Sequence, residues 1–197
     1  MSCTVFTKHL DCPPVSDKEI LRYAGCKCNN DEVSALLCDC LAEAENNLSY
    51  RVCYCKLGVK IDRNICDFGA FKVESSDLAK NLSGCSEAIV FCATVGAMLD
   101  RLIAKYERIL PSKAVLFQAI GTERVEAVCD CFCDQISREM GKGVKPRFSA
   151  GYGDLPLELQ SGIFALLSCE KNIGVTLNDS FFMSPSKSVT AFVGLCD

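Results

Sequence analysis

The feature that most constrains the fold is a continuous apolar run from Glu87 to Thr94, which reads E-A-I-V-F-C-A-T. A run of this length suits a strand and is too short for a typical globular helix. The run therefore predicts a strand that is buried in the interior of the protein.

Helical periodicity marks much of the remaining chain. Ser16-Asp17-Lys18-Glu19 is a capping box, in which Ser16 accepts from the Glu19 amide and the Glu19 side chain reaches back. The helix that it opens should stop at Gly25, since glycine favours the C′ position. A second helix, from Asp31, carries one apolar stripe. Further helices are predicted over Ser75–Leu82, from Gly96 to a break at Pro111, from about Lys113 to Met140, and over Leu157–Cys169.

Strand spacing replaces helical spacing in residues 51–61. Cys53 and Cys55 alternate there with Tyr54 and Lys56, which predicts a half-buried strand whose cysteines face the core. The other predicted extended segments are residues 1–14, an extended piece around Ile65–Val73 that could pair with residues 51–61, and the closing strands Val175–Leu177 and Val189–Leu195.

Helices and strands therefore mix along the chain without strict alternation. This order favours an α+β fold over a doubly wound parallel sheet. We expect a single unit over residues 1–197, in which residues 1–90 are the more loosely assigned part and residues 91–197 carry the ligand motif.

Charge and hydropathy exclude several classes of partner. The net charge of −4 provides no basic field for a phosphate backbone, so no nucleic-acid partner is expected. No apolar run approaches the roughly 20 residues that cross a bilayer, so no membrane association is expected. The N-terminus has no basic segment followed by an apolar one, which argues against a signal peptide and favours a cytoplasmic location.

The sixteen cysteines are interpreted as reduced thiols. Several form C-x-C pairs, but residues two apart on a helix point to different sides, so Cys38 and Cys40 cannot chelate one ion together. Cys53 and Cys55 share the predicted core face, where a thiol behaves as a small hydrophobic group. No metal site is predicted. Cys26-Lys27-Cys28 lies in a loop and leaves a thiol or iron–sulfur redox protein open as an alternative.

The usual catalytic residues are missing. His9 is the only histidine and has no nearby nucleophile, which argues against a histidine triad. The chain also lacks a nucleophile elbow, a phosphate-binding loop and a dinucleotide fingerprint. We therefore expect that the protein has no self-contained set of catalytic residues.

The segment R-F-S-A-G-Y-G-D-L-P-L-E-L-Q, from Arg147 to Gln160, carries the strongest binding signal. The Arg147 guanidinium matches a carboxylate, and Gly151 and Gly153 allow the backbone to approach a ligand closely. Tyr152 can pack against an apolar or aromatic ligand face. These residues suit a small zwitterionic ligand, but they fit a solvated arginine before an ordinary turn equally well.

Asp154, in the same segment, has two interpretations. It can contact a ligand, or it can cap the helix that begins near Leu157. Asp-Leu-Pro directly before a helix is a common start signal, so the cap is favoured.

The R-x-x-x-G-Y pattern of Arg147–Tyr152 resembles the S-adenosylmethionine-binding motif in the activation (reactivation) domain of vitamin B12-dependent methionine synthase. Its surroundings extend the resemblance. Residues 177–189 are similar to the family segment L-T-x-S-F-M-M-S-P-x-x-S-V, and Glu126 matches a ligand-facing glutamate. The front of the chain, with S-D-K-E-I-L-R-Y-A-G, looks like free-standing versions of this domain.

The resemblance implies a mixed, mainly antiparallel twisted sheet flanked by helices. It also implies a reactivation subunit that acts in trans on a cobalamin-dependent methionine synthase. S-adenosylmethionine would be presented for the reductive methylation of cob(II)alamin, with the cobalamin carried by the partner and a flavodoxin or ferredoxin as candidate reductant. Arg147 would pair with the methionine carboxylate, the amides near Ala150, Gly151 and Tyr152 would hold the ligand, and Glu126 would be a polar contact.

The chain departs from the family pattern at Gly153-Asp154-Leu155-Pro156, where fused domains have Pro-Ala-Cys-Pro. The N-terminal stretch that supplies a ligand aspartate in fused domains has no counterpart. The alternative is therefore a non-enzymatic docking module for a corrinoid protein that has lost the ligand.

Overall fold

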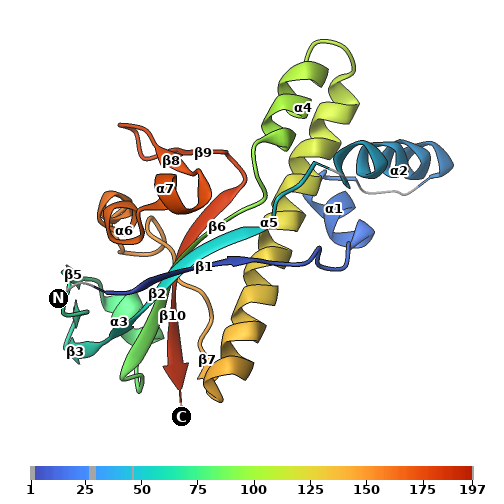
Figure 1. Ribbon diagram of the computed structural model, residues 1–197. Helices are drawn as coiled ribbons and strands as arrows, with labels where there is room; N and C mark the ends of the chain where they lie inside the picture. The colour runs from blue at the N-terminus through green and yellow to red at the C-terminus, as the bar shows by residue number, and fades with distance from the viewer. Residues whose placement is uncertain (1–2, 27–29, 46, 197) are drawn as a thin grey trace.

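The computed structural model describes residues 3–26, 30–45 and 47–196. Its centre is a twisted five-stranded sheet in which every neighbouring pair is antiparallel (Figure 1). This confirms the predicted α+β fold with a mainly antiparallel sheet flanked by helices. The spatial order is β1 (Val5–His9), β2 (Arg51–Gly58), β6 (Glu87–Thr94), β10 (Ser188–Cys196) and β7 (Gly143–Val144).

Strand β6 is the buried central strand that the sequence predicts, with the predicted bounds. It lies between β2 and β10, so its backbone groups are paired on both sides. Its side chains alternate between two apolar clusters: Ile89 and Phe91 face one, whereas Val90 and Cys92 face the other. The continuous apolar sequence follows from this double burial, because neither face meets water.

The helices form the two layers that cover the sheet (Figure 1). The longest, α5, packs on one face together with α1, α2 and α4, and α3, α6 and α7 contribute to the cluster on the other face. The bounds are α1 Asp17–Tyr23, α2 Asp31–Glu45, α3 Ser76–Asn81, α4 Met98–Tyr106, α5 Pro111–Met140, α6 Leu159–Leu167 and α7 Cys169–Ile173.

Two helix boundaries differ from the predictions. The helix predicted to run from Gly96 to a break at Pro111 ends earlier, at Tyr106, and Pro111 is instead the first residue of α5, where its missing amide hydrogen costs nothing. The helix predicted over Leu157–Cys169 is two helices, because Ser168 adopts a left-handed conformation with φ of 48°. The second helix continues the chain to a stop at Gly174, which also has positive φ.

The strand predicted over residues 51–61 is shorter and more deeply buried than expected. It ends at Gly58, and Lys60–Asp62 forms β3 in a second small sheet with β4 (Ile65–Asp67) and β5 (Lys72–Glu74). Tyr54, placed opposite the core in the sequence analysis, is only 7% exposed and lies 5.1 Å from Phe132 of α5, ring centre to ring centre. Helix α5 covers the face of β2 that carries Tyr54, which the alternating sequence pattern assigned to the side away from the core.

No helix in the described part of the chain has the length and apolar character needed to cross a bilayer.

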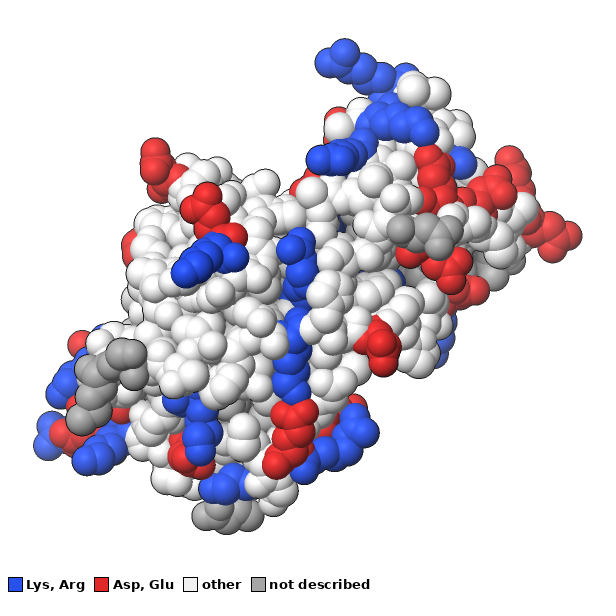
Figure 2. Space-filling model, viewed as in Figure 1, with Lys and Arg blue, Asp and Glu red and all other residues white. Residues whose placement is uncertain are grey.

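Charged side chains of both signs are scattered over the face shown in Figure 2. Lys and Arg gather at the end where α4 meets α5, whereas Asp and Glu gather over α2. The remaining two-stranded sheet, β8 (Thr176–Leu177) with β9 (Met183–Ser184), lies beside α6.

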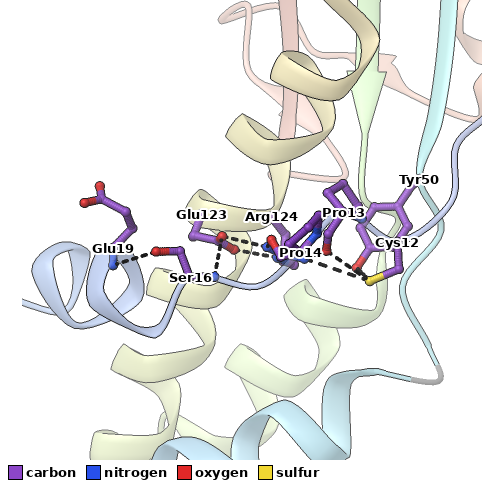
Figure 3. Close-up of polar contacts among 8 residues, drawn as sticks. All are labelled: Cys12, Pro13, Pro14, Ser16, Glu19, Tyr50, Glu123 and Arg124. Carbon is purple, nitrogen blue, oxygen red and sulfur yellow. Dashed lines mark hydrogen bonds and ion pairs between the residues drawn. The ribbon is translucent and has the colours of Figure 1, made fainter. Parts of the chain in front are cut away.

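A buried ion pair joins α5 to the segment between β1 and α1 (Figure 3). Arg124 and Glu123 are 1% and 5% exposed. The Arg124 guanidinium donates to the carbonyl oxygens of Pro13 at 2.6 Å and Pro14 at 2.7 Å, and to the Glu123 carboxylate at 2.6 Å. The shortest hydrogen bonds of this cation are therefore with the neighbouring carboxylate and with the backbone of the N-terminal segment.

The same carboxylate replaces half of the predicted capping box. Ser16 accepts from the Glu19 amide at 3.4 Å, as predicted. The Glu19 side chain instead binds Arg22, and the Ser16 amide donates to Glu123 at 3.1 Å. The start of α1 is thus capped from within and from α5 (Figure 3).

Replacing Arg124 tests this anchor. Arg124→Met leaves the Glu123 carboxylate buried without its partner, so the free energy of unfolding should fall by about 3–5 kcal/mol in urea denaturation. The double variant Glu123→Leu/Arg124→Met should lose less, because no lone charge stays buried. Arg22→Met removes an exposed pair and should leave the urea midpoint nearly unchanged. Equal losses for Arg124→Met and Arg22→Met would contradict the anchor.

Candidate functional site

The sheet edge positions Arg147. After β7, Lys145 donates its amide to the Gly194 carbonyl at 2.9 Å, and Phe148 exchanges two backbone hydrogen bonds with Phe192 of β10, at 3.0 and 2.8 Å. Arg147 lies between these two attachment points, so its backbone is fixed on β10 while its side chain is free to leave the sheet.

The Arg147 side chain meets α5. Its Nη2 lies 2.6 Å from Oε2 of Glu126, and its Nη1 binds the carboxylate of Asp130. These two acids are one helical turn apart and project on the same side of α5. Burial alone would lower the pKa of Arg147, but the hydrogen bond to Asp130 and the charges of both acids raise it above its usual value. The cation is therefore fully charged and held by two carboxylates.

A groove of about 830 Å³ opens at this contact. Three acidic residues of α5 line one side at intervals of four residues, and residues of the strand–loop segment line the other. Tyr152 is 70% exposed and presents its ring at this groove. The volume falls in the range of small-molecule sites, about 300–1,000 Å³. The lining residues that carry the argument are Glu126, Asp130, Asp134, Lys145, Arg147 and Tyr152.

The predicted site residues are thus only partly brought together. Glu126, Arg147 and Tyr152 line the groove, whereas Ala150 is buried and neither it nor Gly151 is among the described residues of the lining. The amide of Gly151 donates to the Leu155 carbonyl at 2.9 Å, and that of Tyr152 donates to Ser149 at 3.1 Å. Both amides serve the turn itself in this structure.

Asp130 is the candidate site residue that the sequence did not single out. Its position four residues after Glu126 was the available signal, because residues i and i+4 share a helix face. That signal gains meaning only once Glu126 is known to face Arg147, which the tertiary structure alone shows.

Asp154 caps a helix, but not the one predicted. It accepts from the amides of Ser76 at 2.7 Å and Asp77 at 3.2 Å, and from the hydroxyls of Ser75 and Ser76, at the start of α3. These hydrogen bonds from Ser75 and Ser76 hold the pKa of Asp154 far below its usual range. The predicted cap near Leu157 is therefore wrong: the Asp154 carboxylate joins the loop to α3.

Glycine at 153 permits this contact. Gly153 has φ of 54°, and a Cβ built there would lie 2.2 Å from Oδ2 of Asp77. A side chain there would force the Asp77 side chain to move and would strain the backbone at this positive φ. The Gly153-Asp154 pair, where the chain departs from the family pattern, is thus a structural attachment between the loop and α3.

The thiols of Cys129 and Cys133 lack the lowered pKa that is typical of a reactive cysteine. Burial raises the pKa of Cys129 and of Cys133 above the usual value, so both stay protonated near neutral pH. Among the described residues, no group of three or more histidines, cysteines or acids is arranged to hold a metal ion. Of the loop pair Cys26 and Cys28, the second lies outside the described residues.

A second hollow, of about 700 Å³, lies between α6, α7 and β8. Its lining includes Phe164, Ala165 and Leu177, and its two charged residues, Glu170 and Lys171, are neighbours at the start of α7. It has no counterpart of the Arg147 cation facing two carboxylates across the opening. The groove at Arg147 is therefore the better candidate site.

Known proteins match the part of the chain that carries the groove. The family described as "Vitamin B12 dependent methionine synthase, activation domain" matches residues 72–195. No curated protein sequence matches the chain. Thirteen chains of solved structures match this chain. One of them is the "Crystal Structure of the MetH Reactivation Domain bound to AdoHcy". It superposes with a TM-score of 0.70 at 15% identity, over 98% of this chain and 78% of that one, which shows a shared fold.

The Asp154 attachment makes a prediction about pH. A carboxylate whose pKa is lowered by folding stabilises the protein above its unfolded pKa, about 3.9, and loses this effect as the pH falls through the folded pKa. Asp154→Asn should therefore lower the urea midpoint at pH 7, and its difference from wild type should shrink as the pH falls from about 4 towards 2. Asp179→Asn, in the exposed β8–β9 turn, is the control. A difference that is constant from pH 7 to pH 2 would count against the attachment.

Proposed function

Because the chain belongs to the vitamin B12-dependent methionine synthase activation domain family, we propose that it binds S-adenosylmethionine in the Arg147 groove. There it would present the ligand for reductive methylation of the corrinoid of a methionine synthase. One observation carries the proposal. Glu126 and Arg147, the positions that match the family's ligand contacts, meet at 2.6 Å across this groove although 21 residues separate them.

The residues in the groove suit the parts of this ligand. The Arg147 guanidinium offers paired donors to the methionine carboxylate. Glu126 and Asp130 offer acceptors to the ammonium group and negative charge near the sulfonium. The exposed Tyr152 ring offers a stacking surface for the adenine. The solved neighbour, whose printed title states that it is bound to AdoHcy, supports a ligand of this adenosyl class.

The described residues of the groove offer hydrogen-bond donors and acceptors that can bind and orient a ligand. The ligand supplies the methyl group, and the nucleophile belongs to the corrinoid of the partner. The task left to this chain is to orient the ligand, which is a large contribution when two reactants must meet in one geometry. Arg147 and Glu126 fix one end of the ligand, so that its methyl group can face outward.

The proposal includes action in trans, as a chain that docks on a separate cobalamin-dependent methionine synthase in the cytoplasm. The resemblance of the front of the chain to free-standing versions of the domain supports this part. A flavodoxin or a ferredoxin is the proposed class of electron donor. The chain thus acts as one component of a methyltransferase rather than as an enzyme by itself.

The alternative is a docking module that keeps the partner and has lost the ligand. One observation favours it: the amides of Gly151 and Tyr152 are used within the loop. On this alternative, the pairing of Arg147 with Glu126 and Asp130 only holds α5 against the loop.

Calorimetric titration with S-adenosylmethionine tests the proposal. Wild-type protein should bind saturably, and Arg147→Ala should weaken binding by about ten- to a hundredfold, as expected for lost hydrogen bonds to a charged group. Arg101→Ala, which removes an exposed arginine of α4, is the control and should bind as wild type does. A wild-type protein without saturable binding would favour the docking module.

Reconstitution tests the action in trans. A methionine synthase that lacks its activation domain, with its cobalamin in the cob(II) state, should regain turnover when this chain, S-adenosylmethionine and a reductant are added together. Omission of any one of the three should abolish recovery. Unchanged inactivity with all three present, together with proven ligand binding, would contradict the proposed partner.

A further inference from the structure

Two carboxylates share the Arg147 guanidinium in the groove, and this arrangement has a consequence for ligand binding that rests on the proposed function. We propose that Asp130 is an internal substitute for the carboxylate of the ligand. It holds the Arg147 guanidinium in place while the groove is empty and gives up that place when a carboxylate-bearing ligand enters.

The hydrogen bonds of Arg147 show which groups a ligand carboxylate would compete with. Asp130 binds Nη1, and Glu126 binds Nη2 at 2.6 Å. A ligand carboxylate that binds the guanidinium with two parallel hydrogen bonds needs two adjacent donors. Both terminal nitrogens already hold an acidic partner, and the two acids repel a third carboxylate at the same guanidinium, so a ligand carboxylate that binds in this way competes with them for the cation.

Exposure identifies the residue that leaves. The Asp130 side chain is 71% exposed, that of Glu126 is 43% exposed, and that of Arg147 is 22% exposed. An exposed carboxylate regains its full hydration by turning into water, whereas a more enclosed one loses contacts that water does not replace as well. Asp130 is therefore the easier of the two to displace, and Glu126 remains beside the guanidinium.

The exchange leaves the charge around Arg147 unchanged, because one carboxylate replaces another. Asp130 also keeps Arg147 extended across the groove in the absence of ligand, so that less side-chain freedom is lost on binding. The cost is competition: the ligand carboxylate must replace a partner that is already present. A ligand without a carboxylate does not face this competition at Arg147.

Titration of the wild type and three variants with S-adenosylhomocysteine, at one ionic strength, tests the inference. Asp130→Asn should bind about two- to fivefold more tightly than wild type, the range that an exposed ion pair provides. Asp134→Asn removes the same charge from the same groove one turn further along α5, without touching Arg147, and should tighten binding less than Asp130→Asn does. Asp130→Ala, which removes the acceptor as well as the charge, should repeat the tightening.

A second probe separates competition from a general charge effect. 5′-Methylthioadenosine carries the adenosine but no amino-acid carboxylate, and its affinity should be equal in wild type and Asp130→Asn. Unchanged or weaker binding of S-adenosylhomocysteine by Asp130→Asn, or equal tightening in Asp134→Asn, would overturn the inference while the proposed function stands. No saturable binding by any of these proteins would overturn both.

Discussion

The pairing of arginine with the carboxylates of α5 holds this molecule together at two places. Arg124 and Glu123 fix the segment that leads from β1 into α1. Two turns or less further along, Glu126 and Asp130 hold Arg147, whose backbone is attached to β10. Helix α5 thus connects the N-terminal edge of the sheet with the loop that carries the groove.

The same chemistry has different consequences at the two places because burial differs. Arg124 is enclosed and bonded to backbone carbonyls, so breaking its pair would leave a charge without water or partner. The partners of Arg147 reach solvent, and Asp130 is largely exposed. A pair of the first kind is permanent and structural. A pair of the second kind is exchangeable, which is what a binding site for a charged ligand requires.

Sequence periodicity predicted most elements, since side-chain spacing reports directly which face of a helix or strand is apolar. It gave β6 its bounds and placed α5 nearly correctly, and Ser16 and Ser75 cap their helices. It was wrong for Tyr54, because alternation shows that two faces differ but not that a helix will cover the second one. It was also wrong for Asp154, whose hydrogen bonds reach Ser75 and Ser76 rather than the adjoining helix.

The sequence by itself determined the buried strand, the long helix and the motif that places Arg147 before a glycine turn, because these depend on neighbours within a few residues. Only the tertiary structure decided what Arg147 binds, where the Asp154 carboxylate goes and which acid joins Glu126 at the groove. These contacts join residues from 17 to 79 positions apart. Their partners are selected by the packing of the sheet, α3 and α5, which no local pattern encodes.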